Sequence, residues 1–245
     1  MVYWLSFLIL FSPMLYADDS SSRAQRIIEE MEYLYRGSAS RANLTMIIIT
    51  PRHERVLKMS SASLGQDYSL YRILEPKKES GISTLKRERE MWNYFPKINK
   101  VIKVPPSMMM GSWMGSDVTN DDLLRETELI DAYDLSLETS ESEYRITLSP
   151  KPETVTVWAK IDYIVDRQAM LPSEQIFYDE KDRKIRLMEF GKREEFEGIL
   201  LPSRISVIPF NRPGYKTIIE YTNLHFDPPD VKRNLFTRRN LTSRF

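Results

Sequence analysis

The side chains that could perform catalysis or bind a metal are few in this chain, and they are far apart in the sequence. The two histidines, His53 and His225, have no neighbour at the spacing of metal ligands. Cysteine is absent, which excludes a thiolate nucleophile and a cysteine-bound metal. The run Met-Gly-Ser-Asp at 114–117 lacks the Gly-x-Ser-x-Gly order of a hydrolase. We therefore expect neither an enzyme nor a cofactor site.

The stretch 91–124 combines apolar side chains with residues that form loops. It begins with a predicted strand, Met91–Phe95, in which Trp92 and Tyr94 share one face. A proline ends this strand because it has no N–H to donate, and a second short extended run, Lys97–Val104, follows. We expect Trp92 and Tyr94 to point toward the concave face of a sheet.

The loop that follows these strands is rich in methionine. Its large apolar residues are Met108, Met109, Met110, Trp113 and Met114. Methionine is unbranched and polarizable, so such a surface suits an adaptable apolar ligand. We expect these five side chains to bind that ligand across the mouth of a cavity, with Gly111 and Gly115 as hinges. The alternative is that they only fill one end of the core.

Two helices are predicted. Apolar residues in Ser20–Arg36 recur with helical spacing and form one stripe, which must be buried against a sheet. A short helix follows the methionine-rich loop, capped by Asp117 or Thr119, with Asp121 and Asp122 in its first turn. The first helix and the loop–helix unit would then close a sheet on one side.

Extended segments separated by turn residues dominate the rest of the chain. The expected strands are Asn43–Thr50, Glu54–Ser60, Tyr68–Leu74, Ile82–Arg87, Glu128–Glu138, Glu143–Leu148, Thr154–Val165, Ser173–Tyr178, Lys184–Phe190, Arg204–Ile208 and Tyr215–Asn223. Many short strands at short spacing predict a mainly β (α+β) fold, a strongly curved antiparallel sheet or partial barrel.

The beginning of the chain has the character of a secretory signal. Residues 1–17 contain no charged side chain, and the apolar segment Trp4–Phe11 is shorter than the roughly 20 residues of a membrane-spanning helix. We expect cleavage before Asp18, which leaves residues 18–245 as a single domain; an uncleaved anchor is the alternative. The 35 basic and 35 acidic residues balance, so no net charge indicates nucleic acid as a partner.

Several motifs together resemble a known family. They are Trp92, Tyr94 and Pro96, then Met114, Gly115, Ser116 and Asp117, then Asp121, Asp122 and Leu123, with Leu74-Glu75-Pro76, Gly81 and Leu85 before them and Leu235-Phe236-Thr237 and Leu241 near the end. This pattern resembles the LolA-like family of outer-membrane lipoprotein-sorting carriers in Gram-negative envelopes. The resemblance implies a half-open antiparallel barrel, covered by helices, that shelters acyl chains in the periplasm. It also implies an inner-membrane transporter as a partner.

Two classes of function remain open on this scaffold. One is a periplasmic carrier that moves acyl chains of a lipoprotein or lipid toward the outer membrane. The other is a sensor that binds lipid or lipoprotein without transporting it. A lipid-modifying enzyme is disfavoured because no nucleophile constellation exists. The chain beyond Asp230 carries five cations and no acid, so it either contacts anionic headgroups transiently or is a solvated tail.

Overall fold

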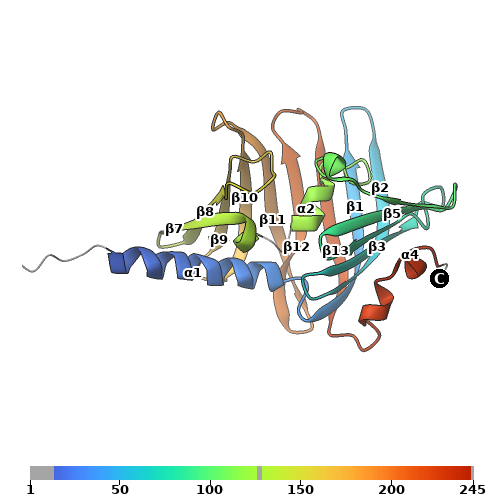
Figure 1. Cartoon of the computed structure of the whole chain (residues 1–245), viewed down its shortest axis with the longest axis horizontal. Coiled ribbons are helices and arrows are strands. Elements are labelled where there is room, and N and C mark those ends of the chain that lie inside the picture. Colours follow the sequence, from blue (N-terminus) through green and yellow to red (C-terminus); the bar gives the residue numbers. More distant parts are fainter. Residues whose placement is uncertain (1–13, 126–128, 244–245) are drawn as a thin grey trace, which may run out of the picture.

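The computed structural model describes residues 14–125 and 129–243. Its main feature is one sheet of thirteen strands in which all neighbours are antiparallel. The strand order is β6-β5-β4-β3-β2-β1-β13-β12-β11-β10-β9-β8-β7, and the sheet curves without closing (Figure 1). The predicted half-open antiparallel fold is therefore confirmed.

Most strands coincide with the extended segments of the sequence. Their bounds are β1 Ala39–Ile49, β2 Glu54–Leu64, β3 Tyr68–Glu75, β4 Ser83–Arg87, β5 Glu90–Phe95, β6 Lys100–Lys103, β7 Tyr133–Thr139, β8 Glu143–Pro150, β9 Lys160–Asp166, β10 Leu171–Tyr178, β11 Lys184–Phe196, β12 Ile199–Pro209 and β13 Lys216–Phe226. Strands β1–β6 and β7–β13 form two meanders, which the pairing of β1 with β13 joins at the centre of the sheet. Leu44 of β1, for example, lies between Met59 of β2 and Tyr221 of β13.

Helix α1, Met14–Tyr33, crosses the open side of the sheet near β7–β10 (Figure 1). Its buried residues Ala24, Ile28 and Met31 pack in one cluster with side chains of β8 and β9 such as Ile146. The helix begins earlier than predicted, and residues 1–13 of the expected signal peptide lie outside the described residues. Within the described residues, no helix has both the length and the apolar character needed to span a membrane.

The connection between the two meanders contains three short helices, η1 Pro106–Met108, α2 Asn120–Arg125 and α3 Leu129–Ala132. Thr119 caps α2: its Oγ1 accepts from the amide of Asp122 at 3.1 Å, and its own amide donates to Asp122 Oδ2 at 2.7 Å. The expected cap at Thr119 is confirmed. The expected strand Glu128–Glu138 is wrong over residues 129–132, because α3 forms there and β7 begins only at Tyr133, while residue 128 lies outside the described residues.

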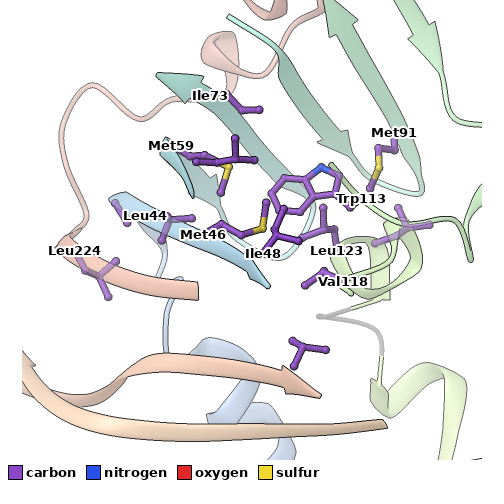
Figure 2. Close-up of a cluster of buried hydrophobic side chains, with 14 of the residues drawn as sticks. Leu44, Met46, Ile48, Met59, Ile73, Met91, Trp113, Val118, Leu123 and Leu224 are labelled. Carbon is purple, nitrogen blue, oxygen red and sulfur yellow. The ribbon is translucent and has the colours of Figure 1, made fainter. Parts of the chain in front are cut away.

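The two faces of the β1–β5 half of the sheet are both covered. The concave face holds a core cluster that includes Met46, Met59 and Trp113 (Figure 2). The outer face is covered by the C-terminal segment, which contains η2 Arg233–Leu235 and α4 Arg238–Leu241. Consequently, strand residues of both parities are buried in this half, and alternation alone cannot distinguish the two sides.

Candidate ligand-binding cavity

A cavity of about 150 Å³ lies between the concave face of the sheet, α1 and the segment that contains α2. Its walls are mainly apolar, with contributions from both meanders. The lining residues are Met31, Glu32, Tyr35, Leu44, Met59, Tyr71, Trp113, Val118, Asp121, Asp122, Leu123, Leu129, Tyr133, Trp158, Ile161, Tyr163, Gln175, Phe177, Met188, Phe190, Ile205, Ile219 and Tyr221. This arrangement, a concave apolar site with a few polar groups, is typical of a site for a small apolar ligand.

The methionine-rich loop is held in place by its own backbone. The amide of Trp113 donates to the carbonyl of Val118 at 2.7 Å, and the amide of Asn120 donates to the carbonyl of Gly111 at 3.0 Å. The side chain of Asn120 donates to the same Gly111 carbonyl and to that of Met108. These bonds make a compact loop in the closed conformation.

Trp113 is the side chain by which this loop enters the core. Only 2% of it is exposed, and Figure 2 shows it surrounded by buried side chains of the sheet. Its indole Nε1 donates to Thr84 Oγ1 at 3.0 Å, and its ring meets the Tyr71 ring edge-on at a centroid distance of 5.3 Å. Because the indole N–H has a partner, the large ring is buried without an unsatisfied donor.

An ion pair joins α2 to the concave face of the sheet. Arg186 of β11 donates through both terminal nitrogens to the two carboxylate oxygens of Asp122, each at 2.7 Å. The side chains are 4% and 15% exposed, respectively. The guanidinium also lies over the rings of Phe177 and Trp158, at 4.0 and 4.7 Å from their centroids. We call this contact the lid pair, and α2 with the loop before it (residues 104–125) the lid.

The electrostatics of the lid pair favour the charged state of Asp122. Burial by itself would raise the pKa of the Asp122 carboxyl. The positive charge and hydrogen bonds of Arg186, together with the bonds from Thr119, outweigh burial and hold that pKa below its ordinary value. Arg186 Nε is buried and has no hydrogen-bond partner among the described residues. The pair is therefore ionised at neutral pH. It is one of several contacts between the lid and the sheet, since Lys86 Nζ also donates to the carbonyl of Leu124 at 2.7 Å and Thr217 Oγ1 donates to Asp117 at 2.9 Å.

The cavity wall outside the lid is rich in aromatic rings. Tyr35, in the turn after α1, stacks on Tyr221 of β13 at a centroid distance of 4.9 Å, and its hydroxyl donates to the carbonyl of Pro202 at 2.8 Å. Trp158 packs against Phe177 at 5.0 Å. Rings of this kind bury large areas while their polar tips remain hydrogen-bonded. The wall can therefore contact an apolar chain without leaving polar groups unsatisfied.

The structure brings only part of the predicted loop site to the cavity. Trp113 lines it, and Met109 and Met114 pack against the adjoining core cluster. Met110 is half-buried and Met108 is 59% exposed; neither lines the cavity. The loop thus supplies one cavity residue and two supporting ones, and ligand binding by the methionines stays a prediction.

The two predicted hinge glycines have different backbone roles. Gly115 has φ +73°, which an L-residue rarely adopts. Gly111 has an ordinary φ, but a Cβ there would lie 2.9 Å from the carbonyl oxygen of Met108. Both positions thus require glycine for the closed loop, and their function as hinges stays a prediction.

The expected orientation of Trp92 and Tyr94 is wrong. Both belong to the cluster on the outer face of the sheet, where Trp92 packs with Phe236 and Leu241 of the C-terminal segment. Their strand neighbour Met91 faces the concave side instead. The alternation correctly placed the two rings on one face, but the C-terminal segment buries the face opposite the cavity.

Sequence reasoning missed Arg186, Trp158 and Tyr35. Arg186 has the same strand parity as the cavity residue Met188, which would have indicated an inward-facing cation in β11. Its partner, Asp122, is 64 residues away, so no local pattern connects the two. Trp158 lies in the irregular segment before β9, which the sequence had predicted as strand from Thr154.

Comparison with known proteins agrees with this architecture. A family model described as "Uncharacterized protein" matches residues 65–243, and the chain belongs to that family. No curated protein matches the chain.

Three solved structures share the fold over most of their length. A DUF1329 family protein from Desulfovibrio piger has 22% identity and a TM-score of 0.81, over 91% of this chain and 99% of the other. A putative outer membrane lipoprotein-sorting protein domain from Vibrio parahaemolyticus has 18% identity and a TM-score of 0.79, over 91% and 100%. A LolA superfamily protein from Nitrosomonas europaea has 20% identity and a TM-score of 0.72, over 89% and 98%. The chain therefore has the open-barrel fold of the LolA superfamily, as the resemblance implied.

Proposed function

We propose that this protein is a non-enzymatic carrier that binds acyl chains of a lipoprotein or lipid beneath its lid and transfers them toward the outer membrane. The observation that supports this best is the apolar cavity between the concave sheet and a lid held by the lid pair. The fold agrees with the proposal, because two of the structures that share it are named for lipoprotein sorting or the LolA superfamily.

The cavity volume implies that the lid moves during loading. The cavity of about 150 Å³ is smaller than the roughly 300–1,000 Å³ of pockets that hold drug-sized ligands. An acyl chain therefore requires a wider space than the closed form offers. Displacement of α2 would provide it, because Asp121, Asp122 and Leu123 of this helix form part of the cavity wall.

Loading would require an external source of energy. Transfer of an acyl chain out of water is worth roughly 0.8 kcal/mol per methylene, or on the order of 10 kcal/mol for about 16 carbons. A membrane already provides this stabilisation, so a carrier gains little by taking the chain from it. We propose that an energised inner-membrane transporter loads the protein in the periplasm, after cleavage before Asp18 leaves residues 18–245 as one domain.

The binding step can be tested with a pair of variants on one strand. Ile219 of β13 lines the cavity, whereas its neighbour Ile218 has the opposite parity. Ile219→Trp should reduce binding of a fluorescent fatty acid such as cis-parinaric acid, while Ile218→Trp should leave it unchanged. Mass spectrometry of organic extracts of the purified protein would identify bound lipid. Equal binding by both variants and wild type would refute the cavity as the site.

Transfer distinguishes the carrier from a sensor on the same scaffold. Protein loaded with an acylated peptide would be mixed with acceptor vesicles, and donor vesicles would be tested with and without the energised transporter. A carrier should deliver cargo to the acceptor, and it should extract cargo from the donor rapidly only with the transporter. Binding without delivery would identify a sensor, and fast extraction without the transporter would identify a passive lipid-binding module.

A further inference from the structure

Two neighbouring turns at one end of the sheet carry four exposed lysines. Lys77 and Lys78 lie in the turn between β3 and β4, and Lys97 and Lys100 lie at the turn between β5 and β6. The turns are adjacent, since a Cβ on Gly81 would lie 3.4 Å from Cγ of Pro96. We call these four lysines and Ile98 the basic tip.

The charge of the basic tip is not neutralised by nearby acids. Glu75 pairs with Lys58 at 2.9 Å, Glu79 pairs with Arg55 at 3.5 Å, and Glu90 pairs with Lys103. None of the four tip lysines has an ion pair within residues 14–125 and 129–243. Four positive charges therefore stand close together with no acidic partner.

Apolar side chains are exposed beside these lysines. Ile98 is 59% exposed at the turn itself, and Val101 and Ile102 of β6 are 37% and 45% exposed. The turn is well defined: the amide of Asn99 donates to the carbonyl of Pro96 at 3.2 Å, and the Tyr94 hydroxyl donates to Asn99 Oδ1 at 3.1 Å. An exposed isoleucine is thus held at the end of a hairpin. In Figure 1, β5 lies at the right end of the sheet, near α4.

We propose that the basic tip docks on an anionic membrane surface, with Ile98 inserted among the headgroups and the four lysines facing the lipid phosphates. Lysines around an exposed apolar side chain match the chemistry of such an interface. A partner strand on the free edge fits less well, because β6 has only four residues and offers few backbone hydrogen bonds. A second copy at this edge would bring like charges together. This inference goes beyond the proposed cargo and does not depend on it.

The expected binding is electrostatic and modest. Each lysine near an anionic surface contributes about 1 kcal/mol, which corresponds to a change of roughly five-fold in partitioning. Lys97→Glu combined with Lys100→Glu should therefore reduce binding to phosphatidylglycerol-containing vesicles by at least about 25-fold. The matched control is Lys181→Glu with Lys184→Glu, at exposed positions in and beside the β10–β11 turn that make no ion pair in the part of the chain described.

Insertion can be followed separately because the chain has no cysteine. Ile98→Cys provides a unique site for an environment-sensitive fluorophore, and Val155→Cys, at a position 83% exposed and outside the tip, provides the control. Vesicles that contain phosphatidylglycerol should shift the emission of the label at 98 toward that of an apolar medium and leave the label at 155 unchanged. Vesicles of phosphatidylcholine alone should shift neither label.

The proposal predicts that the wild-type protein and the control variant with Lys181→Glu and Lys184→Glu co-sediment with anionic vesicles. The tip variant, with Lys97→Glu and Lys100→Glu, should not co-sediment with them. Absence of binding by wild type, or equal binding by both charge-reversal variants, would overturn it. Loss only with Arg238→Glu and Arg239→Glu would assign the contact to the C-terminal tail instead. Fatty-acid binding by the tip variant should remain at the wild-type level, so this test fails or succeeds independently of the cavity.

Discussion

Removal of the lid pair tests whether one ion pair holds the lid closed. Asp122→Ala leaves the charge of Arg186 without its partner. The Arg186 side chain is only 4% exposed in the wild-type protein. Loss of one partner of a buried pair costs roughly 3–5 kcal/mol, because the remaining charge stays desolvated. Here we expect the lower part of that range, since the guanidinium keeps its contacts with the rings of Phe177 and Trp158.

This loss of stabilising free energy should appear first as opening of the lid. Helix α2 has only six residues, so it can move away and allow water to reach Arg186 without unfolding the sheet. A loss of about 3 kcal/mol corresponds to roughly a 100-fold higher open population, because each 1.4 kcal/mol is a factor of ten. Amide hydrogen exchange within α2 should accelerate by about that factor, while exchange in β1 and β13 stays slow.

A double-mutant cycle separates the ion pair from other effects of the substitution. Asp122→Leu alone and Arg186→Met alone should each open the lid, because each leaves the other member of the pair buried without its counter-charge. Asp122→Leu combined with Arg186→Met should recover most of the closed population, since an apolar pair of similar volume is often neutral or stabilising. If the effects of the two single substitutions simply add in the double variant, the lid is not held by this pair and the reasoning is refuted.

The same contact predicts the direction of the pH dependence. The folded-state pKa of Asp122 is lowered, so the stabilisation from the lid pair is fully present above the ordinary carboxyl pKa of about 4. It is lost as the pH falls through the lowered pKa. The protection of the α2 amides, which is their exchange rate relative to the unfolded chain at the same pH, should therefore be constant from neutral pH to about pH 5 and should decrease only in more acidic solution.

Three further variants examine the lid from other sides. Thr119→Ala removes the cap of α2 and should destabilise this helix by about 1 kcal/mol. Amide exchange in α2 should therefore increase less than in Asp122→Ala. An equal increase would contradict the larger contribution of the lid pair. Gly115→Ala places a Cβ at a residue with φ +73° and should lower the free energy of unfolding, measured by chemical denaturation, by roughly 1–2 kcal/mol. The control is Gly191→Ala, which should leave that free energy unchanged because no atom lies within 4 Å of the added Cβ. Met109→Asp with Met110→Asp should weaken fatty-acid binding more than thermal stability, and equal losses would mean that the loop is only core.

Local signals in the sequence were sufficient to predict most strands. The end of β5 before Pro96 and the cap of α2 at Thr119 follow from the chemistry of one or two residues. The first part of the expected strand Glu128–Glu138 failed, because one helical turn, Leu129–Ala132, is too short for its period to differ from that of a strand. Local chemistry therefore positions strand ends and caps but not single helical turns.

The candidate site was predicted less well because its contacts join distant parts of the chain. Strand alternation placed Trp92 and Tyr94 on one face, yet only the packing of Phe236 and Leu241 decides that this face is the outer one. The lid pair likewise depends on how α2 packs against β11, and no spacing of residues in the sequence predicts this packing. The apolar character of one loop was enough to predict that Trp113 lines the cavity, whereas no local pattern predicts a pair that forms across the fold.

The energies of the lid pair and of an acyl chain together suggest how loading and release can both occur. In the proposed function, the lid is closed in the unloaded protein through the lid pair and its other contacts with the sheet, such as the bond from Lys86 Nζ to the carbonyl of Leu124 at 2.7 Å. An acyl chain that enters must displace the lid and lose these contacts, but it gains roughly 0.8 kcal/mol for each methylene removed from water. In an aqueous compartment the loaded state is therefore favoured, whereas next to a membrane the chain loses little by leaving and the lid pair favours release. The proposed carrier would therefore deliver cargo on contact with an acceptor membrane and would need work only at the donor.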